Sequence, residues 1–385
     1  MSLQLGQGTG PLRGIRVVEL AGIGPGPHAC MILADLGADV IRIDRPTGAS
    51  IGGGTSDILN RGRPSVALDL KDPRAIETVL RLVEDADVLV EGMRPGVTER
   101  LGLGPEDCRA RNPRLVYGRM TGWGQSGPWS QMAGHDMNYI SIAGALHGLG
   151  QDKARPHFPM NLVGDFGGGS TYLVIGLLAA LLEARVSGTG QVVDAAIVDG
   201  TAHLNAMGAA FLSSGLQGEG RVSGLLDGGT PYYDLYETAD GEHVSVGALE
   251  PQFYAELLDR LGIADEAPDR YDPANFPALR KLLTDTFRQR TRAEWAAVFD
   301  GSDACVAPVL PLREAFDHPH NVAREVFVER DGLTQPAPAP RFSRTAATLS
   351  TGPAVAGQHT RDALTAWGVD DVDTLIAEGV AVQAT

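Results

Sequence analysis

Basic side chains that could bind phosphate are concentrated in the first third of the chain. The guanidinium of arginine presents a rigid fork of donors that pairs with phosphate oxygens in two parallel hydrogen bonds. Several of these residues fall in predicted loops after short β-rich runs, where open α/β sheets bind ligands. Solvated arginines have the same appearance in a sequence, so both interpretations stay open. The residues concerned are Arg45, Arg61, Arg63, Lys71, Arg94 and Arg100.

A glycine-rich turn at residues 22–27 invites a dinucleotide-binding interpretation. It follows a β-rich run at 15–20, and an acidic residue, Asp44, lies about 20 positions further on, where it would hold a ribose. The pattern fails in detail, because Pro27 stands where the third glycine belongs. Pro25 and Pro27 also lack the N–H groups that cradle a pyrophosphate. The sequence therefore favours a tight turn that begins a helix over the binding of NAD.

Two side chains further along have chemistry suited to proton transfer. His135 carries an imidazole that titrates near neutral pH, although an isolated His-Asp dipeptide is more often structural. Asp165 precedes a run of glycines at the predicted start of a helix, where aspartate is favoured as an N-cap. The helix dipole would stabilise its carboxylate, whereas burial would raise its pKa.

The elements that must position these residues alternate between strand and helix. Such alternation predicts an α/β fold, with a parallel sheet covered by helices on both faces. Strands are expected at 15–20, 38–44, 87–91, 115–120 and 191–197, and helices at 28–36, 73–82, 165–185 and 199–213.

The pattern changes near residue 221. Two short β-rich runs around an Asp-Gly turn predict a hairpin, and three helical patterns follow. We expect a large domain over 1–221, completed by 329–385, and a smaller α+β domain over 222–328. A proline-rich tract near 336–340 connects the small domain to the returning tail.

The composition limits the classes of function that the chain can have. The chain has 385 residues, 43% of them hydrophobic, and a net charge of −16, which argues against nucleic acid as a partner. Residues 1–120 hold 15 of the 32 basic and 15 of the 48 acidic residues, so the remainder carries the whole net charge. An anionic ligand is therefore better received by the first third of the chain.

Cysteine usage and the termini give further expectations. The three cysteines are far apart and form no Cys-x-x-Cys or Cys/His cluster, so no metal site is expected and a reducing cytoplasm fits. The N-terminus lacks the pattern of a signal peptide. The apolar stretch at 171–184 is too short to span a bilayer and predicts a buried helix, so no membrane association is expected.

Seven segments, taken in order, resemble one family. The chain is similar to the CoA-transferase family III superfamily and, within it, to the α-methylacyl-CoA racemases. Each segment alone is a weak signal, but together they run in the family's order, and the resemblance extends at least over residues 11–260. They lie at 14–27, 34–40, 94–102, 121–125, 134–139, 164–168 and 190–195.

The resemblance implies a Rossmann-like large domain, a small α+β domain and an interlocked homodimer that acts on acyl-CoA thioesters. The family's catalytic pair corresponds to His135 and Asp165, and Glu250 matches a small-domain glutamate that supports the histidine. Two groups on opposite faces of the α-carbon would remove and return a proton, with an enolate between them. CoA is part of the substrate, so no separate cofactor is implied.

The resemblance also implies residues for binding. We expect Gly167 and Gly168 to let the thioester approach the helix start, where backbone N–H groups would receive the enolate oxygen. The residues expected to bind substrate or CoA are Ile23, Arg45, Leu68, Asp69, Lys71, Arg94, Arg100, Gly134, Asp136, Asn138 and Tyr139. For Asp136 and Tyr139, support of the site is the alternative to binding.

The transferases of this superfamily are the alternative, because they use the aspartate at the position of Asp165 as a nucleophile. Two features favour a racemase. His135 supplies the second proton-transfer group, and the apolar Ile23 stands where formyl-CoA transferases carry glutamine.

Overall fold

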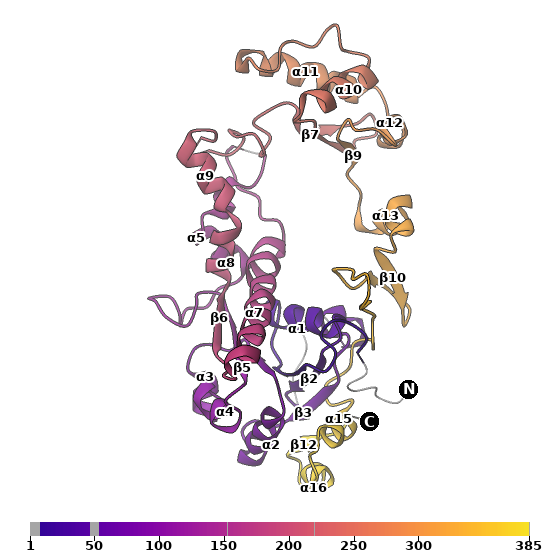
Figure 1. Cartoon of the computed structure of the whole chain (residues 1–385). Helices are drawn as coiled ribbons and strands as arrows, with labels where there is room; N and C mark the ends of the chain where they lie inside the picture. The colour runs from indigo at the N-terminus through magenta and orange to yellow at the C-terminus, as the bar shows by residue number, and fades with distance from the viewer. Residues whose placement is uncertain (1–7, 47–53, 152, 219, 385) are drawn as a thin grey trace. The chain divides into compact units, whose positions relative to one another are not determined.

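The structure is a computed structural model that describes residues 8–46, 54–151, 153–218 and 220–384. The chain divides into two compact units (Figure 1). Unit 1 comprises residues 1–143, 160–204 and 321–385, and unit 2 comprises residues 144–159 and 205–320. Residues 1–7 of the predicted large domain lie outside the described residues.

Unit 1 is built on a sheet in which seven strands pair among the described residues. Five of the six neighbouring pairs are parallel, and the sixth joins β12 antiparallel to β3. The predicted parallel sheet is therefore confirmed, with one antiparallel edge strand added by the returning tail. Across the sheet, the strands are β12 (Ala381–Val382), β3 (Ser65–Leu68), β2 (Asp39–Asp44), β1 (Arg16–Leu20), β4 (Val88–Glu91), β5 (Val116–Thr121) and β6 (Val192–Ala196).

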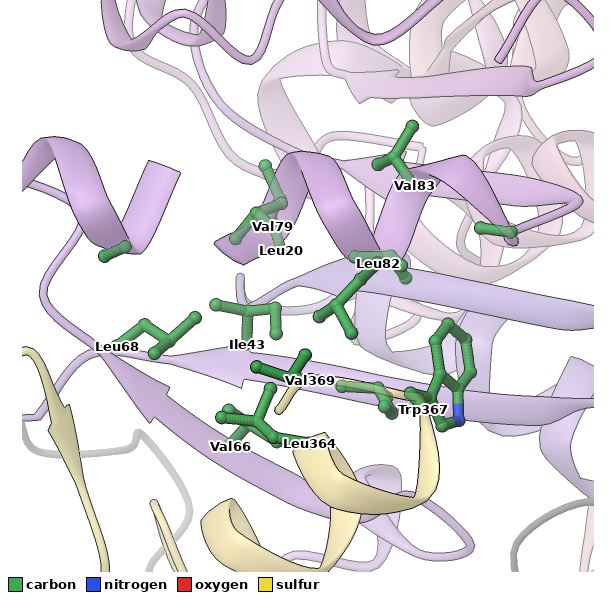
Figure 2. Close-up of a cluster of buried hydrophobic side chains, with 14 of the residues drawn as sticks. Leu20, Ile43, Val66, Leu68, Val79, Leu82, Val83, Leu364, Trp367 and Val369 are labelled. Atoms are coloured by element: carbon green, nitrogen blue, oxygen red, sulfur yellow. The ribbon is translucent and has the colours of Figure 1, made fainter. Parts of the chain in front are cut away.

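Helices cover both faces of this sheet because its strands are apolar on both sides. Alternate residues point to opposite faces, so Val18 and Leu20 enter one core while Val17 enters the other. Figure 2 shows the first core, where Trp367 of the C-terminal tail packs beside Leu82. This core is covered by α2 (Pro73–Glu84), α4 (Pro105–Arg111), α15 (Thr360–Ala366) and α16 (Val372–Ala377). The second is covered by α1 (Pro25–Asp35) and α7 (Thr171–Ser187).

The remaining elements of unit 1 are short. They include α3 (Val97–Leu101), α5 (Asp136–Ile142), α8 (Ile197–Leu204) and a π-helical segment, η3 (Leu162–Ser170), that runs directly into α7. The 3₁₀ turns η1 (Gly54–Ser56) and η2 (Ile58–Asn60) precede β3, and the hairpin of β10 (Phe327–Arg330) and β11 (Leu333–Pro336) precedes the tail.

Unit 2 has its own core and its own small antiparallel sheet. The predicted hairpin and the three predicted helices are all present. The strands are β7 (Tyr233–Glu237), β8 (His243–Gly247) and β9 (Val306–Pro308). The helices are α6 (Ala145–Gly148), α9 (Ala206–Ser214), α10 (Pro251–Leu261), α11 (Phe276–Phe287), α12 (Arg292–Phe299), α13 (Leu312–Asp317) and, at the junction with unit 1, α14 (Pro319–Ala323), with the 3₁₀ turn η4 (Pro273–Asn275) before α11.

The division of the chain differs from the predicted boundaries at 221/222 and 328/329. The structure places them at 204/205 and 320/321, and it adds residues 144–159 to unit 2. Hydrogen bonds explain the addition, because Arg221 donates to the carbonyls of His147 and Lys153. Contacts of this kind, between segments some 70 residues apart, leave no mark on local periodicity.

The apolar helix of unit 1 is longer than the sequence indicated. Segment η3 and helix α7 form one stretch of 26 residues, Leu162–Ser187, which by length and composition could cross a membrane. Within it, Leu173 and Leu177 pack into the core beside the sheet, whereas Leu182 and Val186 are exposed. A core helix can have the same length and composition, so this finding does not by itself place the stretch in a membrane.

Candidate active site

A cavity of about 430 Å³ opens at the carboxyl ends of the central strands of unit 1. Its walls come from the turn after β1, the loop after β4 and the segment after β5. The strand order reverses between β1 and β4, which is where open α/β sheets bind their ligands. His135, Asp165, Tyr139, Gly134, Ile23 and Arg94 all line this cavity, so the structure brings six of the predicted site residues together.

His135 is held by the start of α5. It is the N-cap residue of that helix, and the Asn138 side-chain oxygen accepts a hydrogen bond from the His135 backbone N–H at 3.0 Å. The imidazole itself is exposed toward the cavity. The predicted contact between Asn138 and substrate is thus replaced by a structural role, in which Asn138 fixes the backbone that carries the imidazole.

Asp165 lies in the first turn of η3, whose N-cap is Asn161, so the predicted helix start is confirmed but the N-cap role of Asp165 is wrong. Burial raises the pKa of its carboxyl above the ordinary value, and the nearby Asp136 acts in the same direction. A hydrogen bond from the Asn161 side chain, 3.3 Å from Asp165 Oδ2, and the charge of His135 oppose the shift. The net effect favours the protonated acid, the form that can donate a proton.

Asp136 joins the elements that carry the two candidate catalytic residues. Its Oδ2 accepts a hydrogen bond from the backbone N–H of Asp165 at 2.7 Å, and its pKa is raised by burial. Gly164 has no room for a Cβ, which would stand 2.4 Å from the same oxygen. Asp136 does not line the cavity, and its hydrogen bond connects α5 to η3, which favours the supporting role over substrate binding.

The glycines after Asp165 serve helix packing, which corrects the prediction that they admit the thioester. A Cβ on Gly168 would stand 2.4 Å from Thr201 Oγ1 of α8, and one on Gly167 would stand 3.1 Å from Leu204 Cδ1. In a π-helix the backbone N–H groups bond to carbonyls five residues back. Neither glycine lines the cavity.

Tyr139 and Gly134 form part of the cavity wall, as predicted. The Tyr139 ring contacts Trp123 edge to face at 4.7 Å, and its hydroxyl donates to the Gly134 carbonyl. Burial and the charge of Asp165 raise the pKa of Tyr139 to about 12, so it remains a neutral phenol. Ile23 projects into the same cavity and is 61% exposed.

Arg61 and Arg63 have structural roles, although the sequence made them candidates for phosphate. Arg63 is fully buried and pairs with Glu19 at 2.8 Å, while Arg61 pairs with Asp35 at 2.6 Å. A guanidinium that is buried and already paired is not available to an anion in solution.

The other predicted CoA contacts are distributed along the same sheet edge. Arg45, Asp69 and Lys71 follow β2 and β3 and are exposed, but they lie outside the cavity. Arg100 is exposed on α3, also outside it. The prediction that Leu68 contacts CoA is wrong, because its side chain is wholly buried in the hydrophobic core (Figure 2).

Glu250 belongs to unit 2, and the cavity is lined by unit 1 alone. It is the N-cap residue of α10, yet its side chain makes no capping hydrogen bond. Its carboxylate is exposed. Glu250 thus stands at a helix start, which is the structural alternative to a role beside the histidine, but its side chain does not cap the helix.

Sequence reasoning missed three residues around Asp165. Asn161 donates to its carboxyl from four positions earlier, a spacing that helical periodicity could have indicated. Gly24, at a positive φ of 67°, allows the carboxyl to approach, since a Cβ there would stand 3.3 Å from Asp165 Oδ2. His28 packs on Phe166 and places its Nδ1 2.6 Å from Ser170 Oγ, contacts that no sequence signal announced.

The comparisons with known proteins all indicate the same protein family. Residues 12–360 match the profile of CoA-transferase family III. The chain is 45% identical to alpha-methylacyl-CoA racemase of Mus musculus, covering 94% of this chain and 95% of that protein. It is 43% identical to the Homo sapiens protein of the same name, over 93% of each. A solved CAIB/BAIF family protein from Brucella suis is similar with a TM-score of 0.80 and 27% identity, covering 94% of this chain and 100% of that one.

Proposed function

The chain belongs to CoA-transferase family III, and we propose that it is the family's α-methylacyl-CoA racemase, which interconverts (2R)- and (2S)-2-methylacyl-CoA thioesters. The single observation that carries this function is the presence of an imidazole and a half-buried carboxyl, His135 and Asp165, in one cavity.

The chemistry needs both groups because a proton must leave one face of the α-carbon and return to the other. In one direction, neutral His135 takes the α-proton and becomes an imidazolium. The electron pair left behind moves into the thioester carbonyl and gives an enolate, and protonated Asp165 then donates to the opposite face. The reverse reaction starts from the imidazolium and the carboxylate, so the proton states of the two groups alternate.

The raised pKa of Asp165 supports this division of roles. A carboxyl that retains its proton to higher pH is available as the protonated acid that the return of a proton requires, and a smaller share of it is present as the ionised nucleophile. The transferase alternative instead needs Asp165 as an ionised nucleophile, and the apolar Ile23 offers no hydrogen bond to an acyl-enzyme. The enolate oxygen also needs hydrogen-bond donors.

The strand order 3-2-1-4-5-6 supports a Rossmann-like interpretation of unit 1. CoA would then lie along the carboxyl edge, with Arg94 in the cavity and Arg45 and Lys71 beyond it. Glu250 would complete the site from the small unit of a second subunit in an interlocked homodimer. We expect a cytoplasmic enzyme that needs no cofactor besides the CoA of its substrate.

The test is exchange with solvent. In D₂O, with (2R)-2-methylacyl-CoA and no acyl acceptor, the enzyme should place deuterium on the α-carbon and reduce optical purity. His135→Ala and Asp165→Ala should each slow racemisation by about 10²- to 10⁴-fold, the usual contribution of a positioned acid or base. Mass spectrometry and chiral chromatography of the thioester measure both effects.

The matched control is Asp199→Ala, which removes an exposed carboxylate of α8 outside the cavity and should leave the rate unchanged. No α-exchange, together with a hydroxylamine-trappable acyl group on Asp165, would replace the racemase with the transferase.

A further inference from the structure

Arg270 of unit 2 is a buried cation without an acidic partner. Its side chain is 5% exposed, and it forms no ion pair with any described residue. Withdrawing a charge from water costs several kcal/mol unless other groups replace the lost hydration. A chain that buries such a group at this cost gains something specific from it.

Aromatic rings provide part of the compensation. The guanidinium carbon lies 4.4 Å from the ring centroid of Tyr254 and 5.0 Å from those of Tyr232 and Tyr271. Each such contact stabilises a cation by about 0.5–2 kcal/mol. The three rings form a cage that fixes the plane and position of the guanidinium fork.

The fork is directed at the two residues that precede Glu250. Arg270 Nη1 donates to the carbonyl of Ala248 and Nη2 to that of Leu249, both at 3.0 Å. These carbonyls lie in the bend where the chain leaves β8 and enters α10. Because consecutive carbonyls are held by one rigid group, the backbone orientation at the next residue is set as well.

A second contact fixes Glu250 from the other side. The backbone N–H of Tyr254 donates to the Glu250 carbonyl at 3.0 Å, and the ring of the same tyrosine lies against Arg270. The Glu250 side chain makes no capping bond and is exposed, so this rigid bend presents a carboxylate that the small unit does not use.

We propose that Arg270 is a positioning residue, which holds the bend at Ala248–Leu249 and thereby aims the carboxylate of Glu250. This assignment rests on the proposed function, in which Glu250 supports the catalytic histidine. Arg270 touches neither substrate nor reacting atoms, so its effect passes through Glu250 alone.

A double-mutant cycle in the full chain tests the assignment, with kcat and KM measured from racemisation of 2-methylacyl-CoA. Arg270→Gln should lower kcat about 10- to 100-fold, the loss expected from a small misplacement of a supporting group. KM should change less than about threefold. In the Glu250→Gln background the same substitution should lower kcat less than about threefold, because the group it positions is already gone.

Two further variants keep the result interpretable. Arg260→Gln is the matched control, because Arg260 anchors the other end of α10 through the Val298 carbonyl, and kcat should stay within threefold of wild type. Arg270→Lys retains the cation among the three rings but loses the fork, so it should lower kcat as much as Arg270→Gln does. This variant tests the assignment even where Arg270→Gln shows no cooperative thermal transition.

The possible outcomes distinguish between the role of Arg270, the role of Glu250 and the proposed function. Equal losses of kcat in the wild-type and Glu250→Gln backgrounds would overturn the assignment, since Arg270 would then act as a general core residue. A Glu250→Gln enzyme with normal kcat would overturn it together with the role of Glu250. Absence of α-exchange by the wild-type protein would instead overturn the proposed racemase, and this assignment with it.

Discussion

Arg63 and Arg94 lie in the same charge-neutral third of the chain, and both flank strands of the large sheet, yet their surroundings are opposite. Arg63 is fully buried against Glu19, with further hydrogen bonds to the Pro27 carbonyl and Asn60. Arg94 is exposed and lines the cavity. Whether an arginine stabilises the fold or receives a ligand thus depends on whether the fold supplies a buried carboxylate.

The largest expected effect is on the free energy of unfolding, and it tests the contrast between Arg63 and Arg94. Arg63→Met leaves Glu19 buried without its cation and should lower the free energy of unfolding by about 3–5 kcal/mol. Arg94→Met removes a solvated charge and should change it by less than about 0.5 kcal/mol. Urea denaturation of the two variants measures the difference. A small loss for Arg63→Met would show that its ion pair is not what holds this part of unit 1.

The next effect concerns pH, because burial raises the pKa of Glu19 to about 7, with Arg63 opposing the shift. The folded chain therefore binds one more proton than the unfolded chain between pH 4.5 and about 7. This group makes the free energy of unfolding fall as pH rises through that window. Glu19→Gln should remove that contribution, and urea denaturation at pH 5 and pH 7.5 checks it. An unchanged pH slope in the variant would contradict the assignment of this proton to Glu19.

The smallest effect is on binding. Arg94→Ala should raise KM for the acyl-CoA about tenfold, which corresponds to about 1.4 kcal/mol from one lost charge-assisted contact. Stability should not change. Arg114, exposed just before β5 and so at the opposite edge of the sheet, gives the control variant Arg114→Ala. Equal KM values for the two variants would mean that general charge, and not the position of Arg94, attracts the ligand.

Local patterns predicted most of the elements. Strand periodicity located all five strands that it identified in the large sheet, and the Asp-Gly turn located the hairpin of unit 2. Strands β3 and β12 were not predicted, because runs of four and two residues carry too little periodicity. The same reasoning placed Asp165 at the N-cap of a helix, whereas it lies in the first turn of a π-helical segment, whose bonds differ from those of an α-helix by one residue.

Within the candidate site, the sequence predicted the residues that a motif identifies, and it missed the roles that depend on tertiary contacts. The segment around His135 identified a proton-transfer group, and the cavity contains it. Support was one of the two roles expected for Asp136, but the particular contacts of Asp136 and Asn138 could not be predicted, because each depends on one side-chain oxygen meeting a particular backbone N–H.

The sequence by itself determined the family, the alternation of strands and helices and the two candidate groups for proton transfer, because these depend on residue identity and short-range order. Tertiary structure decided which charges are buried in pairs, which glycines serve packing and how the pKa of Asp165 is shifted. Those properties depend on burial and on partners that are often distant in sequence, since desolvation and hydrogen bonding act through space and not along the chain.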